Sequence, residues 1–424
     1  MLDIQRIREN PSGMREMCER RKLPADIDGI LALDGRRREI IAACEQLKNL
    51  RNRASEEIAA IKKRKEDATA RIAEMKQVAE QIKEKDAEQR QVEASLQEAM
   101  ALVPNVPHES VPRGKSAEDN KEVGRWGEPA KPVAGVKDHL AIGTALDILD
   151  FPRGAKIAGA GFPLYKGGGA LLERALINFM LDLHTQKHGY REVFPPFLVN
   201  RASAFGTTQL PKSADQMYLA TEDDLFCIPT AEVPVTNIHR DEILEERQLP
   251  IRYCAYSACF RREAGSYGKD TKGFLRVHQF NKVELVKITA PEKSYEELEA
   301  LRANAEAVLQ ALGLHYRVML LCDADMSFGA AKCYDLEAWA PVEGRYLEVS
   351  SCSNFEDFQA RRMNLRYRPS AGGKPVFAHT MNGSGLATSR IMVALLETYQ
   401  TPAGTVRVPD VLRPYMHGMD EIRA

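Results

Sequence analysis

Residues 36–103 have the sequence RRREIIAACEQLKNLRNRASEEIAAIKKRKEDATARIAEMKQVAEQIKEKDAEQRQVEASLQEAMALV, which contains neither Gly nor Pro. It is rich in Ala, Glu, Lys, Arg and Gln, a composition typical of long α-helix. Apolar residues recur there at a spacing of seven, which gives each helix an apolar seam that requires a partner. The two series are Leu33, Ile40, Leu47, Ala54 and Ile61, and then Met75, Ile82 and Leu96, with Gln89 interrupting the second.

The charged segment Lys62-Lys63-Arg64-Lys65-Glu66-Asp67 separates the two apolar series. The repeat loses its register there, so we expect a turn between two antiparallel helices of roughly 30 residues, each ~45 Å long at ~1.5 Å per residue. The alternative is one continuous helix in a parallel dimer. The break near residue 65 favours the hairpin.

Basic residues dominate the segment between positions 48 and 65, which a hairpin would place toward its tip. They are Lys48, Arg51, Arg53, Lys62, Lys63, Arg64 and Lys65, against Glu56 and Glu57. One interpretation is a solvated end of a coiled coil. The other is a lever that presents cations to the phosphate backbone of a polynucleotide, and the lack of aromatic residues favours recognition of shape over base stacking.

The whole chain has 424 residues, 59 basic and 60 acidic, a net charge of −1, and 44% hydrophobic residues. This length predicts two or three domains, and the charge balance disfavours a protein that binds nucleic acid by bulk positive charge. The sequence has no run of about eighteen apolar residues and no apolar segment at its N-terminus, so we expect neither a membrane span nor a secretory signal, and a cytoplasmic location. The eight cysteines form no C-x-x-C pair, which predicts buried thiols rather than disulfides or structural zinc.

The first aromatic residue of the chain is Trp126, so the N-terminal region cannot be an ordinary globular core. We expect an N-terminal domain over 1–102, a linker rich in Pro, Gly and charge over 103–132, and a second domain over 133–424. In the second domain, helical spacing appears at 171–183 and 298–312, and strand-like runs lie at 251–260, 274–288 and 345–352. This order favours an α+β fold with an antiparallel sheet.

The common nucleotide and hydrolase signatures are absent from this sequence. Two expected strands, ending in FRRE (260–263) and starting near RVHQF (276–280), are joined by the loop AGSYGKDTKG. Alternation would place Arg261 and Glu263 on one face of the first strand, and Arg276, His278 and Phe280 on one face of the second.

The segment GSGLATSR (383–390) runs into a helical pattern. We interpret Gly383 and Gly385 as positions where the backbone approaches a ligand closely. Arg390 lies among apolar neighbours and requires an anion, which could be a structural carboxylate or a bound ligand.

Taken in order, these segments resemble one family. HGYREVFPPFLV (188–199), FRRE with its loop and RVHQF, and GSGLATSR resemble motifs one, two and three of class II aminoacyl-tRNA synthetases. The segments PTAEVP (229–234), HQFNKVE (278–284), EVSSCSN (348–354), HTMNGSGLA (379–387) and VLRPYM (411–416) resemble the bacterial type of seryl-tRNA synthetase. The resemblance covers the whole chain and implies a class II catalytic domain that is preceded in the sequence by a tRNA-binding helical hairpin.

The implied reaction activates L-serine with ATP to seryl-adenylate and pyrophosphate, and then transfers serine to the 3′ end of tRNA(Ser), or of tRNA(Sec) where present. Arg261 would hold the α-phosphate and the serine carboxylate, Glu263 the adenine edge and Phe280 the adenine face. Arg390 would hold the γ-phosphate, and Glu348 and Ser351 would hold Mg²⁺, a hard ion with hard oxygen ligands. The implied ATP-binding residues are Arg261, Arg262, Glu263, Phe280, Glu348, Val349, Ser350, Ser351 and Arg390, with Arg261, Glu263 and Arg390 catalytic.

The residues implied to bind serine are Thr230, Ala231, Glu232, Arg276, Glu284, Asn382 and Ser384. A pocket that hydrogen-bonds a hydroxyl group rejects alanine and glycine, since its polar groups would be left unpaired. The implied partners are the long variable arm and acceptor end of the tRNA and a second copy of the chain, because motif one builds the dimer interface in this family. Two alternatives remain: a relative that activates another small amino acid or loads a carrier protein, and a non-catalytic RNA-binding or scaffolding protein that has kept the fold.

Overall fold

A computed structural model describes residues 1–131, 135–265 and 272–424. The chain divides into two compact units, Met1–Pro104 and Asn105–Ala424. Within the described ranges, we find no helix that is both long and apolar enough to span a bilayer. The eight cysteines are free thiols, all buried except the partly exposed Cys227, as the sequence predicts.

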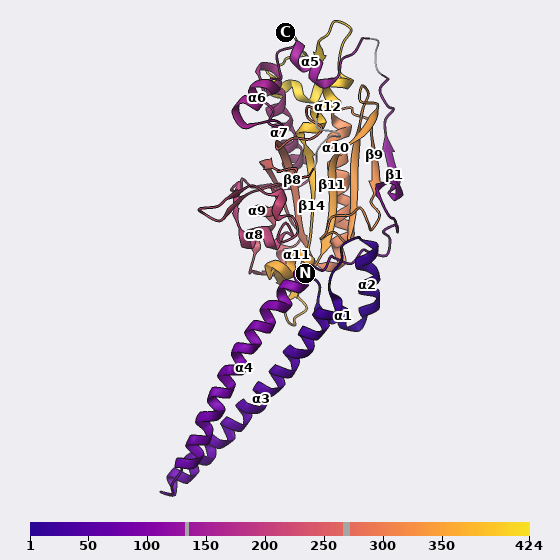
Figure 1. Cartoon of the computed structure of the whole chain (residues 1–424). Helices are drawn as coiled ribbons and strands as arrows, with labels where there is room; N and C mark the ends of the chain where they lie inside the picture. The colour runs from indigo at the N-terminus through magenta and orange to yellow at the C-terminus, as the bar shows by residue number, and fades with distance from the viewer. Residues whose placement is uncertain (132–134, 266–271) are drawn as a thin grey trace. The chain divides into compact units, whose positions relative to one another are not determined.

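The N-terminal unit consists of helices α1 (Ile4–Glu9), α2 (Pro11–Arg20), α3 (Ile27–Lys63) and α4 (Thr69–Ala101). Ion pairs join α3 to α4 at Arg36–Glu88 and at Lys48–Asp86, the latter at 3.1 Å. Arg36 near the start of α3 pairs with Glu88 in the second half of α4, whereas Glu57 near the end of α3 pairs with Arg71 near the start of α4 at 2.8 Å, so the helices are antiparallel (Figure 1). The predicted hairpin is confirmed, and the alternative of one continuous helix is wrong.

The seam between α3 and α4 is built from the predicted repeat. Ala54, Met75, Val78 and Ile82 form a buried cluster with the partly buried Leu47 and Ile58 against it. Helix α3 starts at Ile27, earlier than the repeat suggested, because the Asp26 carboxylate accepts a hydrogen bond from the Gly29 N–H at 2.8 Å and caps the helix. At the turn, the side chains of residues 62–65 are exposed.

The second unit is built on an eight-stranded sheet with the order β1-β9-β10-β11-β14-β8-β7-β2. Every neighbouring pair is antiparallel except β2 with β7. The strands are β1 (Lys121–Trp126), β9 (Tyr316–Leu320), β10 (Lys332–Ala340), β11 (Arg345–Glu356), β14 (His379–Ala387), β8 (Gln279–Thr289), β7 (Ile251–Phe260) and β2 (Arg191–Glu192). The predicted antiparallel α+β fold is therefore confirmed.

Helices α7 (Gly167–Lys187), α10 (Ser294–Ala311) and α12 (Thr388–Thr398) pack on this sheet (Figure 1). Leu176, Leu285, Leu301 and Leu395 from these helices and from β8 are almost fully buried in one core. The remaining α-helices and strands are α5 (His139–Ala145), α6 (Phe151–Ala158), α8 (Arg201–Gly206), α9 (Glu232–Thr236), α11 (Phe358–Met363), β3 (Leu198–Asn200), β4 (Leu219–Ala220), β5 (Leu225–Cys227), β6 (Ile243–Glu245), β12 (Arg366–Arg368), β13 (Val376–Phe377), β15 (Val406–Arg407) and β16 (Glu421–Ile422).

The segment expected to be a linker, 103–132, differs from the expectation because it contains β1. Trp126 of β1 lies opposite Tyr316 of β9, with ring centroids 6.1 Å apart. The strand is at the edge of the sheet and its residues are mostly exposed, so its charged sequence KEVGRW lacks the apolar alternation of a half-buried strand. The last expected linker residue, 132, lies outside the described residues.

The second strand of the motif-two region begins at Gln279, not at 274 as expected. The Phe274 N–H faces the His139 Nε2 at 3.4 Å, and the His278 N–H donates to the Gly161 carbonyl at 2.9 Å. This segment therefore bonds to loops and helices outside the sheet and does not extend β8. The predicted alternation of Arg276 and His278 along a strand is therefore wrong. Most of the loop between the strands, residues 266–271, lies outside the described residues.

Candidate active site

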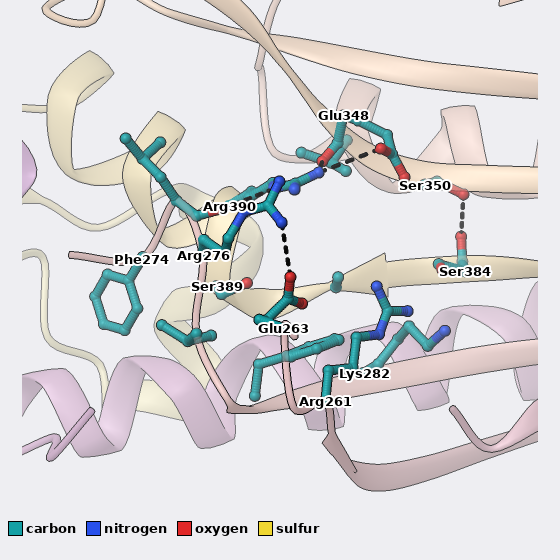
Figure 2. A pocket seen from close by; sticks show the side chains of 15 residues that line it. Arg261, Glu263, Phe274, Arg276, Lys282, Glu348, Ser350, Ser384, Ser389 and Arg390 are labelled. Carbon is teal, nitrogen blue, oxygen red and sulfur yellow. Dashed lines mark hydrogen bonds and ion pairs between the residues drawn. The ribbon is translucent and has the colours of Figure 1, made fainter. Parts of the chain in front are cut away.

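A pocket of about 190 Å³, open to solvent, lies where β7, β8, β11, β14 and α12 meet (Figure 2). The predicted residues that line it are Arg261, Glu263, Arg276, Phe280, Glu348, Val349, Ser350, Ser384 and Arg390, and it is also lined by Phe274, Leu275, Val277, Lys282, Ala387 and Ser389. Residues up to 129 positions apart in the chain thus converge on one pocket, from Arg261 to Arg390.

Two arginines supply positive charge to this pocket. The Arg261 guanidinium lies 5.2 Å from the centre of the Phe280 ring, and the Arg261 Nε is 3.4 Å from the Pro229 carbonyl. On α12, the Arg390 Nη1 donates to the Glu348 carbonyl at 2.9 Å and lies 3.3 Å from the Glu348 carboxylate. Both guanidinium groups are held in place while part of each side chain still faces the pocket, which suits the binding of a polyanion.

Glu263 and Arg276 form an ion pair at 2.8 Å on the wall of the pocket (Figure 2). Glu263 has a left-handed backbone (φ 50°), a conformation that costs energy in a non-glycine residue and is typical of functional sites. The sequence grouped Arg276 with serine, but the structure joins it to Glu263, a member of the predicted ATP-binding set. Arg262, also predicted to bind ATP, is not among the described residues that line the pocket. Its backbone N–H donates to the Gln216 carbonyl at 2.9 Å.

The opposite end of the site is a group of buried polar residues from β8, β14 and the segment before α9. The Glu284 side chain is 2% exposed, and its Oε2 accepts hydrogen bonds from the Thr230 hydroxyl at 3.2 Å and from the Lys282 ammonium at 2.6 Å. Ala231 is fully buried and packs against Val235, as part of the framework of this group. Glu284 and Thr230 are therefore brought together as predicted.

Glu232 lies in the same group and accepts a hydrogen bond from the Gln359 amide at 2.7 Å. Burial of its carboxyl group, together with the negative charge of Glu284, raises the pKa of Glu232 to about 7. The buried Asn382 amide lies close enough to the Glu232 carboxylate to oppose this rise in pKa, although its nitrogen makes no hydrogen bond of good geometry among the described residues. Two acids and this amide form a cradle for a small molecule with an ammonium and a hydroxyl group.

Sequence reasoning missed Lys282 and Gln359. Lys282 could have been found from its spacing, since Phe280, Lys282 and Glu284 alternate along β8 and share one face. Gln359 lies in FQARR on α11 and carries no local signal for a contact with Glu232.

The interpretation of Gly383 and Gly385 as positions where the backbone approaches a ligand stays a prediction, but both glycines also have a packing reason. A Cβ at Gly383 would lie 2.5 Å from the Leu301 side chain, and one at Gly385 would lie 2.7 Å from the His184 ring. Both glycines permit close packing within the protein. Next to them, the Ser350 hydroxyl donates to the Ser384 carbonyl at 2.6 Å and fixes β11 against β14.

Glu348 and Ser351 reach one face of β11 through a β-bulge. The pairing of β10 with β11 shifts between Leu336 and Glu337, so that Glu348 and Ser351 share a face although they are three positions apart. Asp335 lies opposite Ser351 on this face. Burial and the negative charge of Glu348 raise the pKa of the Asp335 carboxyl group well above its usual value. Carboxylate and hydroxyl oxygens on one face are ligands that suit a hard divalent cation such as Mg²⁺, and Glu348 is at the same time paired with Arg390.

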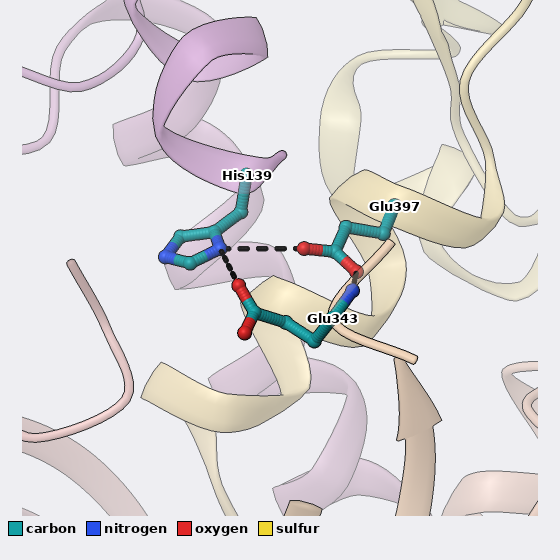
Figure 3. A group of neighbouring side chains, drawn as sticks. All are labelled: His139, Glu343 and Glu397. Carbon is teal, nitrogen blue, oxygen red and sulfur yellow. Dashed lines mark hydrogen bonds and ion pairs between the residues drawn. The ribbon is translucent and has the colours of Figure 1, made fainter. Parts of the chain in front are cut away.

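A second cluster, His139, Glu343 and Glu397, lies beside Phe274 and outside the described pocket lining (Figure 3). The His139 Nδ1 is 3.4 Å from the Oε1 atom of Glu397. The Oε2 atom of Glu397 accepts hydrogen bonds from the backbone N–H groups of Val342 and Glu343 at 3.0 and 3.1 Å. The His139 Nε2 faces the Phe274 N–H. These hydrogen bonds link the motif-two segment to α12, and they account for the cluster without an ion.

Family models match most of the two units. Residues 1–107 match the seryl-tRNA synthetase N-terminal domain, and residues 218–399 match the class II tRNA synthetase core domain (G, H, P, S and T). The chain is 59% identical to the serine–tRNA ligase of Chloroherpeton thalassium over 98% of this chain and 99% of that one. It is 57% identical to that of Chlorobium phaeovibrioides over 100% and 99%.

Two solved structures share this architecture over 100% of this chain and 99% of theirs. The seryl-tRNA synthetase of Pyrococcus horikoshii, complexed with ATP, matches with a TM-score of 0.91 and 37% identity. The cytoplasmic serine–tRNA ligase of Naegleria fowleri, in complex with AMP, matches with a TM-score of 0.87 and 32% identity. The chain therefore belongs to the seryl-tRNA synthetase family of class II aminoacyl-tRNA synthetases.

Proposed function

We propose that this chain is a serine–tRNA ligase: it activates L-serine with ATP to seryl-adenylate and pyrophosphate and then charges tRNA(Ser), and tRNA(Sec) where that tRNA is present. The observation that carries this proposal is the continuity of the site. The arginine-lined pocket and the buried acidic cradle meet on strand β8, where Phe280, Lys282 and Glu284 follow one another on one face.

In the first half-reaction, the serine carboxylate attacks the α-phosphorus of ATP, an O–P bond forms, and the bond to the β-phosphate oxygen breaks. A carboxylate is already ionised at neutral pH, so the step needs positioning and charge neutralisation rather than a general base. Arg261 holds the α-phosphate and the carboxylate, and Phe280 beneath it offers its face to adenine. Glu263 receives the adenine edge, and Arg390 holds the γ-phosphate. We now assign Arg276 to ATP beside Glu263, on the basis of their ion pair.

Glu232 and Glu284 receive the ammonium and hydroxyl groups of serine, with Thr230, Asn382 and Ser384 around them. Alanine and glycine leave these buried polar groups unpaired and are rejected strongly. Threonine carries an extra methyl group and is excluded by the volume of the cradle.

Glu348 and Ser351, with Asp335 beside them, are the residues that would hold Mg²⁺. When bound, the cation neutralises and orients the phosphate oxygens of ATP. The face shared by these residues through the bulge of β11 supports this assignment.

The hairpin is proposed to contact the long variable arm of the tRNA through the exposed basic side chains at its tip. The acceptor end of the same tRNA delivers its terminal ribose to seryl-adenylate in the pocket. The exposure of residues 62–65, in a turn without aromatic residues, supports contact with phosphates. We expect this work to be done in the cytoplasm, where tRNA is charged.

The chain is proposed to act as a homodimer through its motif-one segment. Phe194, Leu198 and Ile238 are apolar yet 73, 45 and 42% exposed, and they lie on or near one open groove. Exposed apolar clusters of this kind mark interaction surfaces. Sedimentation should give a dimer, and Phe194→Asp should shift it toward monomer; a monomeric wild-type chain would contradict the proposal.

Charging of tRNA tests the proposed function. The purified chain should attach labelled serine, and not labelled threonine or alanine, to a tRNA(Ser) transcript in the presence of ATP and Mg²⁺. A tRNA(Ser) transcript shortened in its variable arm should be charged poorly. Equal charging of all three amino acids, or of none, would contradict the assignment.

A further inference from the structure

Lys282 lies between the two halves of the active site, and neither the family resemblance nor the comparisons give it a role. On β8 it follows Phe280 and precedes Glu284 on the same face, it lines the pocket, and its side chain is 7% exposed. A buried lysine at the junction of two binding regions lies where the serine carboxylate and the α-phosphate must meet.

The Lys282 ammonium is bound to Glu284 at 2.6 Å, and Thr230 donates to the same Oε2 atom. The partly buried Glu232 is close enough for the positive charge of Lys282 to oppose the effect of Glu284 on its pKa. Lys282 thus neutralises the acidic cradle. A buried carboxylate that loses its partner is strongly destabilised, so this neutralisation is needed while no ligand is bound.

Binding of serine changes this balance, because serine brings its own ammonium to the acidic cradle. Two ammonium groups on one buried carboxylate repel each other strongly at short range. Serine also brings a carboxylate, and ATP brings an α-phosphate, to the neighbouring part of the pocket. The four-carbon stem of lysine permits its charge to move between such partners.

Arg261 marks the place to which Lys282 can turn. Both side chains line the same pocket, and Figure 2 shows them next to each other. Burial raises the pKa of the Cys259 thiol on β7, and the nearby charges of Lys282 and Arg261 both oppose that rise, so both cations lie near one point of the strand.

We propose that Lys282 is a counter-ion displaced by serine. Its ammonium neutralises Glu284 while the cradle is empty; the serine ammonium replaces it there, and Lys282 then binds the attacking carboxylate and the α-phosphate oxygens beside Arg261. The O–P bond to serine forms as the bond to pyrophosphate breaks, no proton moves, and the lysine offsets the charge that collects on the α-phosphate. This inference rests on the proposed placement of serine at Glu232 and Glu284.

The test is serine-dependent pyrophosphate exchange by Lys282→Met and Lys282→Arg. Loss of one group that stabilises transition-state charge should lower kcat about a hundredfold in Lys282→Met, while the KM values for serine and ATP change less than about fivefold. Lys282→Arg keeps the charge and should restore at least about a tenth of kcat. Lys287→Met is the matched control, because Lys287 lies on the same strand, is even more deeply buried and pairs with Glu297 at 2.7 Å outside the pocket.

An equal loss of kcat in Lys287→Met, or a loss in Lys282→Met confined to the KM for serine, would overturn the proposal. Crystal structures of the wild-type chain, empty and with a sulfamoyl analogue of seryl-adenylate, give a test independent of variant folding. The Lys282 Nζ should leave Glu284 and contact the sulfamoyl group; an unchanged ion pair would overturn it. If Glu284→Gln leaves the KM for serine unchanged, serine binds elsewhere and the proposed placement itself is wrong. A raised KM in Glu284→Gln with normal kcat in Lys282→Met would overturn this inference alone.

Discussion

The tip of the hairpin and the catalytic pocket both collect charge, but in opposite ways. The four basic side chains at residues 62–65 are exposed, and Arg64 forms a long ion pair with Glu66 at 3.6 Å. In the site, by contrast, Glu284 is almost fully buried and is bound by Lys282 and Thr230. Exposed charge suits a long polyanion that is bound by shape, whereas buried and paired charge suits a small ligand whose atoms must be placed accurately. The difference predicts that the two regions can be damaged separately.

The largest effect is expected from shortening the hairpin. Lys48 and Asp86 face each other across the two helices at 3.1 Å, so residues 49–85 can be replaced by a short Gly-Ser loop. Serine-dependent pyrophosphate exchange should stay within about twofold of the wild type, because the pocket is untouched, while tRNA charging should fall by at least about a thousandfold as the phosphate contacts are lost. Charging within about tenfold of the wild type would show that the hairpin has another role.

The substitution Arg261→Ala should impair the pocket and leave the hairpin intact. It should lower pyrophosphate exchange about a thousandfold, because charge stabilisation at the α-phosphate is lost. Binding of tRNA, measured by filter retention, should be unchanged. Arg201→Ala is the matched control, because the Arg201 guanidinium also lies 5.2 Å from an aromatic ring, that of Phe226, and pairs with Asp224 away from the pocket. Near-normal exchange by Arg261→Ala would remove the assignment.

The pKa of Glu232, about 7, predicts a pH dependence that belongs to the pocket and not to the hairpin. Below pH 7 the Glu232 carboxyl group of the free enzyme takes up a proton. It then has no negative charge with which to attract the serine ammonium. The KM for serine should therefore rise up to about tenfold for each pH unit below 7 and level off above it, whereas the KM for tRNA should not follow this curve. Glu232→Gln should have a raised KM that is flat over this range; a flat profile in the wild type would contradict the role of Glu232.

The smallest effect is expected at the tip. Replacing Lys62, Lys63, Arg64 and Lys65 with Gln should raise the KM for tRNA by about tenfold at physiological salt and reduce its dependence on salt concentration, because fewer counterions are released. The kcat for charging should change little. An unchanged salt dependence would mean that the tip is a solvated end of the coiled coil, the alternative left open by the sequence.

The hairpin could be predicted from sequence almost completely, since its stability comes from a repeat that is local in the chain. Ile40, Ala54 and Ile82 are buried where the spacing of seven places them. The main error, the start of α3, came from a cap at Asp26 that lies before the repeat.

The active site was less predictable, because its geometry depends on contacts distant in the chain. Strand alternation placed Arg276 wrongly, since the segment before β8 is fixed by His139 and Gly161 instead of by strand pairing. Asp335 faces Ser351 through the pairing of β10 with β11, and a bulge in that pairing brings Glu348 to the same face, which no local pattern reveals. The edge strand β1 was missed because exposure removes the apolar alternation that marks a strand.

The most direct test of the account is pyrophosphate exchange by the purified chain without tRNA, run separately with serine, threonine, alanine, glycine and cysteine. A single site that joins triphosphate, divalent cation and a hydroxylated amino acid should give exchange with serine at least about a hundredfold above that with each of the other four. Exchange that is equal for serine and alanine, or that needs no amino acid, would contradict the joining of the two halves of the pocket on β8.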